Sequence, residues 1–304
     1  MVFTEFQTIQ EQAEKFSENL FRISKNDDNQ TGILSGFEKL DTITKGFKPS
    51  QLILVGSVSG MGKTSFAVSL IKKMAIENKC SIAFFSLEIS SQQLIIKIIA
   101  QQTNISNEKL RLGLLNDTEI KLVSKKNEEI KNAPLSIFDY PFLTVSDIEY
   151  TLSCSLSDFP KIIIIDSLKF IAKNKKDLAG KILNKKELTK ISFQLKKLAE
   201  KYNSTILLLV DFNLQINELD KSYCRRPLLS DLRKHAPIDT FADLILLLYR
   251  PEYYKIEEWD DEEELPTAGE AEIIITKNSF GNLETIRVQF DGSKAMFDNL
   301  LIDI

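Results

Sequence analysis

A glycine-rich turn places the strongest constraint on this chain. It follows the apolar run 53–55 and precedes a helical segment that starts at Lys63. Successive backbone N–H groups of such a turn point inward and bind phosphate at the positive end of the helix. Lys63 can then reach the phosphate oxygens, and the Thr64 hydroxyl can take one Mg²⁺ position. The sequence therefore predicts a phosphate-binding loop whose nucleotide contacts come from Ser57, Val58, Ser59, Gly60, Met61, Gly62, Lys63, Thr64 and Ser65.

One position of this loop departs from the usual pattern. Glycine is usual where this chain has Ser57, but Gly56 and Gly60 keep the backbone freedom that the turn requires. The alternative is a glycine turn that only ends a strand and leaves Lys63 exposed. The phosphate-binding loop is favoured, because strand, Gly-Lys-Thr triplet and helix occur in the order that phosphate binding needs.

Composition limits what surrounds the loop. The chain has 304 residues, of which 43% are hydrophobic, and this is enough for the core of one large α/β domain. Its net charge of −4 provides no general attraction for nucleic acid, so any such contact must be local. No apolar run approaches the roughly 20 residues of a membrane span, and the N-terminus lacks a positively charged region followed by an apolar stretch. We therefore expect a cytoplasmic protein without a membrane partner.

Cysteine and histidine are too sparse for a metal centre. Cys80, Cys154 and Cys224 lie far apart and have no metal-ligand spacing, which predicts three unlinked thiols in a reducing compartment. The single histidine, His235, leaves no room for a multi-histidine site, and we expect it to be an ordinary loop residue.

The first segment of the chain is predicted to be one amphipathic helix, because its apolar residues are spaced by threes and fours. The polar run 26–32 then indicates a linker. We therefore divide the chain into a helix and linker, residues 1–30, and a large domain, residues 31–304. The apolar stripe must be buried either on its own domain or on a neighbouring subunit, and the sequence leaves both open. Its residues are Phe6, Ile9, Ala13, Phe16, Leu20 and Ile23.

Strands and helices alternate after the linker. Most of the strands are continuous apolar runs, as expected where helices cover both faces of a mainly parallel sheet. The alternating run 284–290 is expected to form an edge hairpin with the strand before it, and the acidic run 259–264 a solvated loop. Strands are predicted at 52–55, 82–86, 135–138, 162–165, 205–210, 244–248 and 273–276, and helices at 63–76, 91–102, 117–130, 145–152 and 187–202.

Two carboxylates follow predicted strands, at the edge of a parallel sheet where ligands bind. Asp166 ends the run 162–166 and is placed to hold Mg²⁺ opposite Thr64. Glu88 follows the run 82–86 and could polarise a water molecule that attacks phosphate. Each carboxylate also has a purely structural alternative. Asp166 could cap a helix that follows the strand, and Glu88 could be an acidic residue at the N-terminus of the next helix.

The order of motifs resembles the ATPase domain of the DnaB-type replicative helicases, ring-forming members of the RecA-like ATPases. This resemblance implies a RecA-like P-loop core, Mg²⁺ and ATP as cofactors, a homo-hexamer with nucleotide between subunits, single-stranded DNA in its channel, and a primase or loader as partner. The motifs extend from residue 31 to the C-terminus. They are Thr31-Gly32 with Gly36-Phe37-Glu38-Lys39-Leu40-Asp41, Ser59-Gly60-Met61-Gly62-Lys63-Thr64, Phe85-Ser86-Leu87-Glu88, Ile165-Asp166-Ser167-Leu168, Arg226-Pro227-Leu228-Leu229-Ser230-Asp231-Leu232-Arg233, Ala242-Asp243-Leu244, Tyr249-Arg250, and Ala271-Glu272-Ile273-Ile274-Ile275-Thr276-Lys277.

The resemblance also implies roles for single residues. Lys63 matches the phosphate-binding lysine and Glu88 the catalytic glutamate, and Thr64 and Asp166 match the metal-binding pair. Arg233 matches a residue of the loop that grips the DNA backbone, and the neighbouring Lys234 adds positive charge there. Lys277 matches the lysine that reaches the γ-phosphate from the next subunit.

Several positions differ from the family. The γ-phosphate-sensing glutamine aligns with Asp211, the arginine of the trans-acting finger with Ser279, and a further glutamine with Lys169. The large N-terminal collar domain of the family has no counterpart in the sequence. We therefore expect an ATP-dependent, ring-forming DNA helicase of replication with slow hydrolysis. The alternative is a hydrolysis-impaired ATP-binding assembly or accessory protein.

A cluster of lysines follows the Asp166 strand. It could add to the DNA channel, or it could be a solvated charged loop, and the sequence leaves both open. Its residues are Lys173, Lys175, Lys176, Lys181, Lys185 and Lys186.

Overall fold

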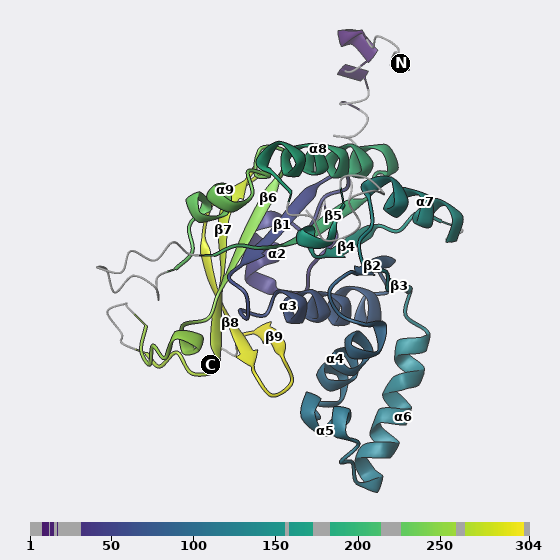
Figure 1. Cartoon of the computed structure of the whole chain (residues 1–304), viewed down its shortest axis with the longest axis vertical. Coiled ribbons are helices and arrows are strands. Elements are labelled where there is room, and N and C mark those ends of the chain that lie inside the picture. The colour runs from purple at the N-terminus through teal and green to yellow at the C-terminus, as the bar shows by residue number, and fades with distance from the viewer. Residues whose placement is uncertain are drawn as a thin grey trace.

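A nine-stranded sheet runs through the molecule in the order β3-β2-β4-β5-β1-β6-β7-β8-β9 (Figure 1). This computed structural model describes residues 8–11, 13–14, 17, 32–155, 158–172, 183–213, 226–259 and 265–300. Neighbouring strands from β3 to β6 are parallel, whereas β7, β8 and β9 are each antiparallel to the strand before them. The strands are β1 (Leu52–Ser57), β2 (Ile82–Ser86), β3 (Leu135–Phe138), β4 (Ile162–Asp166), β5 (Thr205–Asp211), β6 (Leu244–Tyr249), β7 (Glu270–Asn278), β8 (Thr285–Asp291) and β9 (Met296–Asn299).

Helices cover both faces of this sheet, so the predicted α/β fold with a mainly parallel sheet is confirmed. Alternate residues of β1 enter two separate cores: Ile53 and Val55 pack with α2, α3, η1 and α4, whereas Leu52 and Leu54 pack with α7 and α8. Burial on both faces explains why the central strands are continuous apolar runs. The helices are α2 (Glu38–Thr44), α3 (Lys63–Leu70), the π-helix η1 (Ile71–Glu77), α4 (Ser91–Thr103), α5 (Asn107–Leu112), α6 (Asp117–Lys131), α7 (Val145–Ser155), α8 (Lys185–Tyr202) and α9 (Leu229–His235), with 3₁₀ turns η2 (Leu168–Phe170) and η5 (Pro251–Tyr254).

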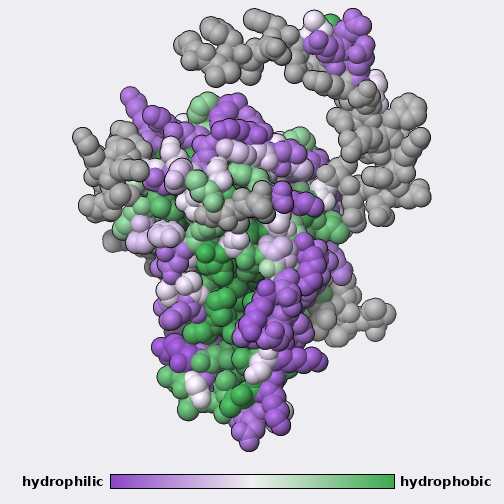
Figure 2. All heavy atoms as spheres, turned by 90° about the vertical axis from the view of Figure 1, so that its right-hand side faces the viewer, coloured by the Kyte–Doolittle hydropathy of each residue, from purple (hydrophilic) through white to green (hydrophobic). Residues whose placement is uncertain are grey.

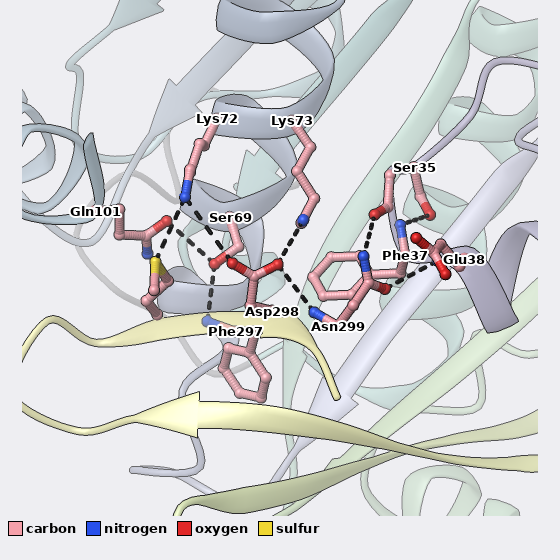
Figure 3. Close-up of polar contacts among 12 residues, drawn as sticks. Ser35, Phe37, Glu38, Ser69, Lys72, Lys73, Gln101, Phe297, Asp298 and Asn299 are labelled. Carbon is pink, nitrogen blue, oxygen red and sulfur yellow. Dashed lines mark hydrogen bonds and ion pairs between the residues drawn. The ribbon is translucent and has the colours of Figure 1, made fainter. Parts of the chain in front are cut away.

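The predicted hairpin of β7 and β8 is confirmed, but its edge position is wrong, because β9 pairs with β8. Figure 3 shows how β9 is fixed on the other side: Asp298 accepts a hydrogen bond from Lys73 Nζ at 2.6 Å, and the Phe297 N–H donates to Ser69 Oγ at 3.0 Å. Asn299 accepts from the Glu38 N–H and donates to Gly36 O. The last strand therefore ties the helix after the glycine-rich turn to the start of the large domain.

The motif Gly36–Asp41 has a structural role in the same region. Both oxygens of the Asp41 carboxylate accept backbone N–H groups, from Ser35 and from Gly36. Gly36 has φ +82°, and a Cβ there would lie 2.7 Å from Cβ of Lys73. A side chain would therefore collide with the helix that β9 is anchored to, which explains the glycine.

Helices α4, α5 and α6 form a lobe at one end of the molecule (Figure 1). The face that carries this lobe has a strip of apolar side chains beside strongly hydrophilic ones (Figure 2). Exposed apolar residues of α5, α6 and their connection are Leu112, Leu114, Ile120 and Leu122.

Other expectations are corrected by the structure. The helix predicted at 63–76 changes to π-helix after Leu70, and α5 and α9 were not predicted. Trp259 does not belong to a solvated loop: it is 3% exposed, and its indole N–H donates to Glu270. The rest of that acidic run, 260–264, lies outside the described residues.

Few residues of the predicted N-terminal stripe can be placed. Ile9 is helical and 86% exposed, and Ala13 is helical and exposed. Phe6, Phe16, Leu20 and Ile23 lie outside the described residues. In the parts of the chain that the structure covers, Cys80 and Cys154 are free thiols, and no helix has the length and apolar character needed to span a membrane. Cys224 lies outside these parts.

Candidate nucleotide-binding site

The carboxyl ends of four adjacent strands bring the predicted site residues together. Ser57 at the end of β1 is paired in register with Asp211 at the end of β5, and Asp166 at the end of β4 is paired with Ser86 at the end of β2. Glu88 follows two residues after Ser86. One edge of the sheet therefore carries the glycine-rich turn and three carboxylates.

Backbone freedom in the turn comes from Gly60, as expected, and from Gly62, whereas Gly56 lies within β1 and does not have a positive φ. Gly60 and Gly62 have φ of +86° and +99°, in the left-handed region that favours glycine. Gly62 is the N-cap of α3, so the turn leads directly into the first helical N–H groups. Lys63 folds back over the turn and donates to Ser57 Oγ at 3.1 Å. Serine in place of the usual glycine thus gives this lysine a polar partner.

Thr64 and Asp166 form the second feature of the site. Thr64 Oγ1 donates to Asp166 Oδ2 at 2.7 Å. The other oxygen of Asp166 is buried and has no hydrogen-bond partner among the described residues. Burial raises the pKa of Asp166 to about 6; the hydrogen bond from Thr64 and the charge of Lys63 oppose this rise, and the charges of Glu88 and Asp211 add to it. A free carboxylate oxygen beside a hydroxyl is a donor set that fits Mg²⁺.

Ion pairs connect the remaining charged groups. Lys63 Nζ lies 2.6 Å from Asp211 Oδ1, so the lysine of the turn forms an ion pair with the last residue of β5. Lys169 Nζ lies 2.8 Å from Glu88 Oε1 and 3.7 Å from Asp211 Oδ2. Asp211 therefore lies within ion-pair distance of two lysines of the same chain.

Three further residues lie beside the turn: Arg250, which belongs to a motif of the resemblance but had no predicted site role, and Tyr253 and Phe290, which were not predicted. The Arg250 guanidinium lies 3.8 Å from the centre of the Phe290 ring and donates to Gly60 O at 3.4 Å. A Cβ on Gly60 would lie 3.0 Å from the Tyr253 hydroxyl. Burial lowers the pKa of Arg250. Phe290 is buried, so Arg250 and Tyr253 provide the planar groups on which an aromatic ring can stack. The Tyr249-Arg250 pair at the end of β6 was the sequence signal for this position.

Lys277 and Ser279 lie toward the amino ends of the parallel strands, whereas the glycine-rich turn follows the carboxyl end of β1. Lys277 is paired with Ile245 of β6, and Ile245 is level with Leu54, three residues before the end of β1 at Ser57. Lys277 Nζ donates to Asp239 O at 2.8 Å, and the Ser279 N–H donates to Asp243 O at 2.9 Å. Within one subunit, the structure therefore does not bring these residues to the turn.

Arg233 and Lys234 are exposed, but they lie in helix α9 and not in a loop as expected. Arg233 Nε donates to Asp239 Oδ2 at 2.7 Å. His235, the last residue of α9, lines a cavity of about 500 Å³ that also contains Lys169 and Asp211. The end of α9 therefore reaches the network of ion pairs. Of the lysine cluster, Lys185 and Lys186 are exposed at the start of α8, and 173–182 lie outside the described residues.

Comparisons with known proteins agree with one another. The sequence profile of the "DnaB-like helicase C terminal domain" matches residues 32–299. The chain is 33% identical over 276 residues to the replicative DNA helicase DnaB of Buchnera aphidicola (subsp. Baizongia pistaciae), covering 88% of this chain and 56% of that one. It is 29% identical over 284 residues to DnaB of Geobacillus stearothermophilus, covering 93% and 60%. The chain thus spans less than two thirds of these relatives.

Solved structures give the same result. One solved ATPase domain superposes on this chain with a TM-score of 0.82 at 27% identity, with 95% of this chain and 98% of that one covered. A DnaB-like replicative helicase, studied with its interactions with primase, has a TM-score of 0.79 at 27% identity, with 98% and 68% covered.

Proposed function

The chain belongs to the family of DnaB-like helicase C-terminal domains, and from this membership we propose that it is an ATP-dependent, ring-forming motor that acts on single-stranded DNA in replication. The observation that carries the proposal is the meeting of Lys63, Thr64, Asp166 and Glu88 at one edge of the sheet. A lysine, a metal-binding pair and a general base are the groups that hydrolysis of a γ-phosphate requires.

In the proposed reaction, ATP is the substrate and its phosphates lie in the glycine-rich turn. Lys63 binds the phosphate oxygens, and Thr64 and Asp166 would hold Mg²⁺, which would supply positive charge at the phosphates. Glu88 orients a water molecule and accepts its proton as the water oxygen bonds to the γ-phosphorus, while the bond from this phosphorus to the β–γ bridging oxygen breaks and ADP leaves. The base of the nucleotide stacks on the surface formed by Arg250 and Tyr253.

Assembly is part of the proposal, because Lys277 lies far from the turn of its own subunit. In a homo-hexameric ring, Lys277 reaches the nucleotide of the next subunit, and Ser279 stands where an arginine would complete the contact. The exposed apolar strip on the lobe of α4, α5 and α6 offers surface that a neighbouring subunit would bury. We further propose the division into residues 1–30 and 31–304, action in the cytoplasm, and a primase or loader as partner.

Single-stranded DNA is proposed to contact Arg233 and Lys234. Both side chains are exposed, and they follow one another at the end of α9. Cations of this kind bind phosphate and not bases, so the contact is local and independent of sequence.

The second candidate function is an ATP-binding assembly protein that scarcely hydrolyses ATP. One observation favours it, namely the ion pair of Asp211 with the lysine of the turn, and the proposed match of Ser279 to the arginine of the finger points the same way. Steady-state ATP hydrolysis with and without single-stranded DNA separates the two functions. Turnover stimulated by DNA supports the motor, and stoichiometric binding with negligible turnover supports the assembly protein.

Calorimetry tests the premise that both functions share. The parent protein is expected to bind Mg·ATP, and Lys63→Ala to lose most of this affinity, because the lysine replaces lost hydration of the phosphates with a fixed charge. If Lys63→Ala binds Mg·ATP as tightly as the parent does, the glycine-rich turn is not the nucleotide-binding site.

A further inference from the structure

Two lysines and two carboxylates form a continuous line of contacts across the strand ends. Lys63 contacts one oxygen of Asp211 at 2.6 Å, and Lys169 lies 3.7 Å from the other. Lys169 also contacts Glu88 at 2.8 Å. Each lysine therefore has Asp211 within reach, and Lys169 lies between two carboxylates.

Binding of phosphate by Lys63 would weaken the shortest ion pair of Asp211. The Lys63 side chain is 7% exposed and its ammonium group contacts Asp211 and Ser57, so a phosphate oxygen that binds this ammonium group competes with Asp211 for its charge. The second oxygen of Asp211 is buried and accepts no hydrogen bond from the described residues. A carboxylate of this kind repels a nearby phosphate unless another cation neutralises it.

Lys169 is suited to neutralise Asp211. It lies in η2, shortly after β4, and its side chain is 43% exposed, so its flexible arm can move without disturbing the core. Its distances to Glu88 and Asp211 differ by 0.9 Å (3.7 minus 2.8), which a change of side-chain torsion covers. Burial lowers the pKa of Lys169, but the hydrogen bond to Glu88 and the charge of Asp211 outweigh this effect, and its pKa is raised. The lysine therefore stays charged.

We propose that Lys169 is a positioning residue that moves from Glu88 to Asp211 when ATP draws Lys63 onto its phosphates. This inference rests on the proposed function of the site. The move has two consequences: Asp211 no longer repels the γ-phosphate, and Glu88 is released to accept the proton of the attacking water. Without ATP, Lys169 holds Glu88 in an ion pair and the base is blocked.

A double-mutant cycle of Lys169→Gln and Asp211→Gln tests the proposal. Calorimetry measures the affinity of each full-length variant for Mg·ATP and for Mg·ADP. Lys169→Gln is expected to weaken Mg·ATP by about tenfold or more, because Asp211 is left uncompensated beside the γ-phosphate, and to weaken Mg·ADP less. In the Asp211→Gln background, the same lysine replacement is expected to change Mg·ATP affinity by less than about twofold.

Single-turnover hydrolysis provides the second readout. The double variant should hydrolyse bound ATP faster than Asp211→Gln alone, because in the single variant Lys169 remains on Glu88. Lys169→Arg should keep the affinity of the parent, since it keeps the charge. Lys201→Gln is the matched control: it removes an ion pair of 2.6 Å to Glu149, and it should leave both readouts unchanged. Thermal unfolding of every variant shows whether it is folded.

The outcomes separate this inference from the function on which it rests. If the parent binds Mg·ATP through Lys63 and the losses of the two single variants simply add, Lys169 acts independently of Asp211 and the inference is wrong. If the double variant is no faster than Asp211→Gln, Lys169 does not block Glu88. If the parent does not bind Mg·ATP, the proposed function fails and this inference fails with it.

Discussion

Replacing Asp166 with asparagine is expected to stabilise the folded protein while it abolishes Mg²⁺-dependent nucleotide binding. Asp166 is 1% exposed, and one of its oxygens has no hydrogen-bond partner among the described residues. Burial raises its pKa from 3.8 to about 6. The folded state therefore holds the proton more tightly than the unfolded state does, and ionisation of Asp166 at neutral pH opposes folding.

The size of the effect follows from the two pKa values. A difference of about two units corresponds to about 3 kcal/mol, at 1.36 kcal/mol a unit. Between pH 3.8 and 6 the unfolded state is ionised and the folded state is protonated, so stability falls as pH rises through this window and the whole cost is present above pH 6. Asparagine can still accept the hydrogen bond from Thr64, and we therefore expect Asp166→Asn to raise the free energy of unfolding by about 2–3 kcal/mol at pH 7.5.

Urea unfolding without Mg²⁺ and nucleotide measures this difference. The gain in Asp166→Asn should be about 1.4 kcal/mol smaller at pH 5 than at pH 7.5, because Asp166 of the folded parent is mostly protonated at the lower pH. Asp158→Asn, a change at an exposed aspartate, is the control and should show no such dependence. An Asp166→Asn variant that is less stable than the parent at pH 7.5 would show that the folded state compensates the charge, and the argument from burial would be wrong.

Three further predictions concern assembly, DNA and turnover. Deleting the residues before Asn26 should lower the oligomeric mass in light scattering, because the large apolar side chains of this segment each gain about 1.5–3 kcal/mol on burial; an unchanged mass would exclude it as an intersubunit contact. Arg233→Ala with Lys234→Ala should weaken single-stranded DNA binding for all sequences alike and flatten its salt dependence, and unaffected binding would place the DNA elsewhere. Ser279→Arg should raise DNA-stimulated turnover by about tenfold or more, as an arginine finger does in related reactions, and an unchanged rate would contradict the alignment of this position.

The central strands could be predicted from the sequence, because each is buried on both faces of the sheet and is therefore a continuous apolar run. The bounds of β2 and β3 were predicted without error, and β1, β4, β5 and β6 within two residues. β9 could not be predicted, because its four residues are held by pairing with β8 and by polar contacts with α3, η1 and the segment before α2. Such contacts join positions more than 220 residues apart and leave no local periodicity.

The core of the site could be predicted for a similar reason. Parallel strands end on one side of the sheet, so residues that follow separate strands meet there, and this rule, together with the glycine-rich turn and the family resemblance, placed Glu88 and Asp166 in the site. The ion pairs of Asp211 with Lys63 and Lys169 could not be predicted. They depend on the directions of side chains from β5, α3 and η2, which are far apart in the sequence. The positions of Arg250 and Tyr253 at the turn were not predicted, although Arg250 belongs to a motif of the resemblance, because both reach the turn from beyond β6 and their types alone do not indicate a nucleotide site.

Asp211 and Ser279, two of the three positions expected to differ from the family, can be studied in a single subunit to different extents. Asp211 lies at the turn, and Lys63 and Lys169 compensate its charge within the same chain, so its consequences belong to the single subunit. Ser279 lies at the amino ends of the parallel strands, on the opposite side of the sheet from the turn. Lys277 is level with Leu54, three residues before the turn, and Ser279 lies farther away still. Ser279 therefore cannot act on the nucleotide of its own subunit. Any effect of Ser279 on hydrolysis therefore requires assembly, whereas the exchange of Lys169 between Glu88 and Asp211 requires only ATP. A protein kept monomeric would consequently retain the coupling of Lys169 with Asp211 and lose all dependence on Ser279.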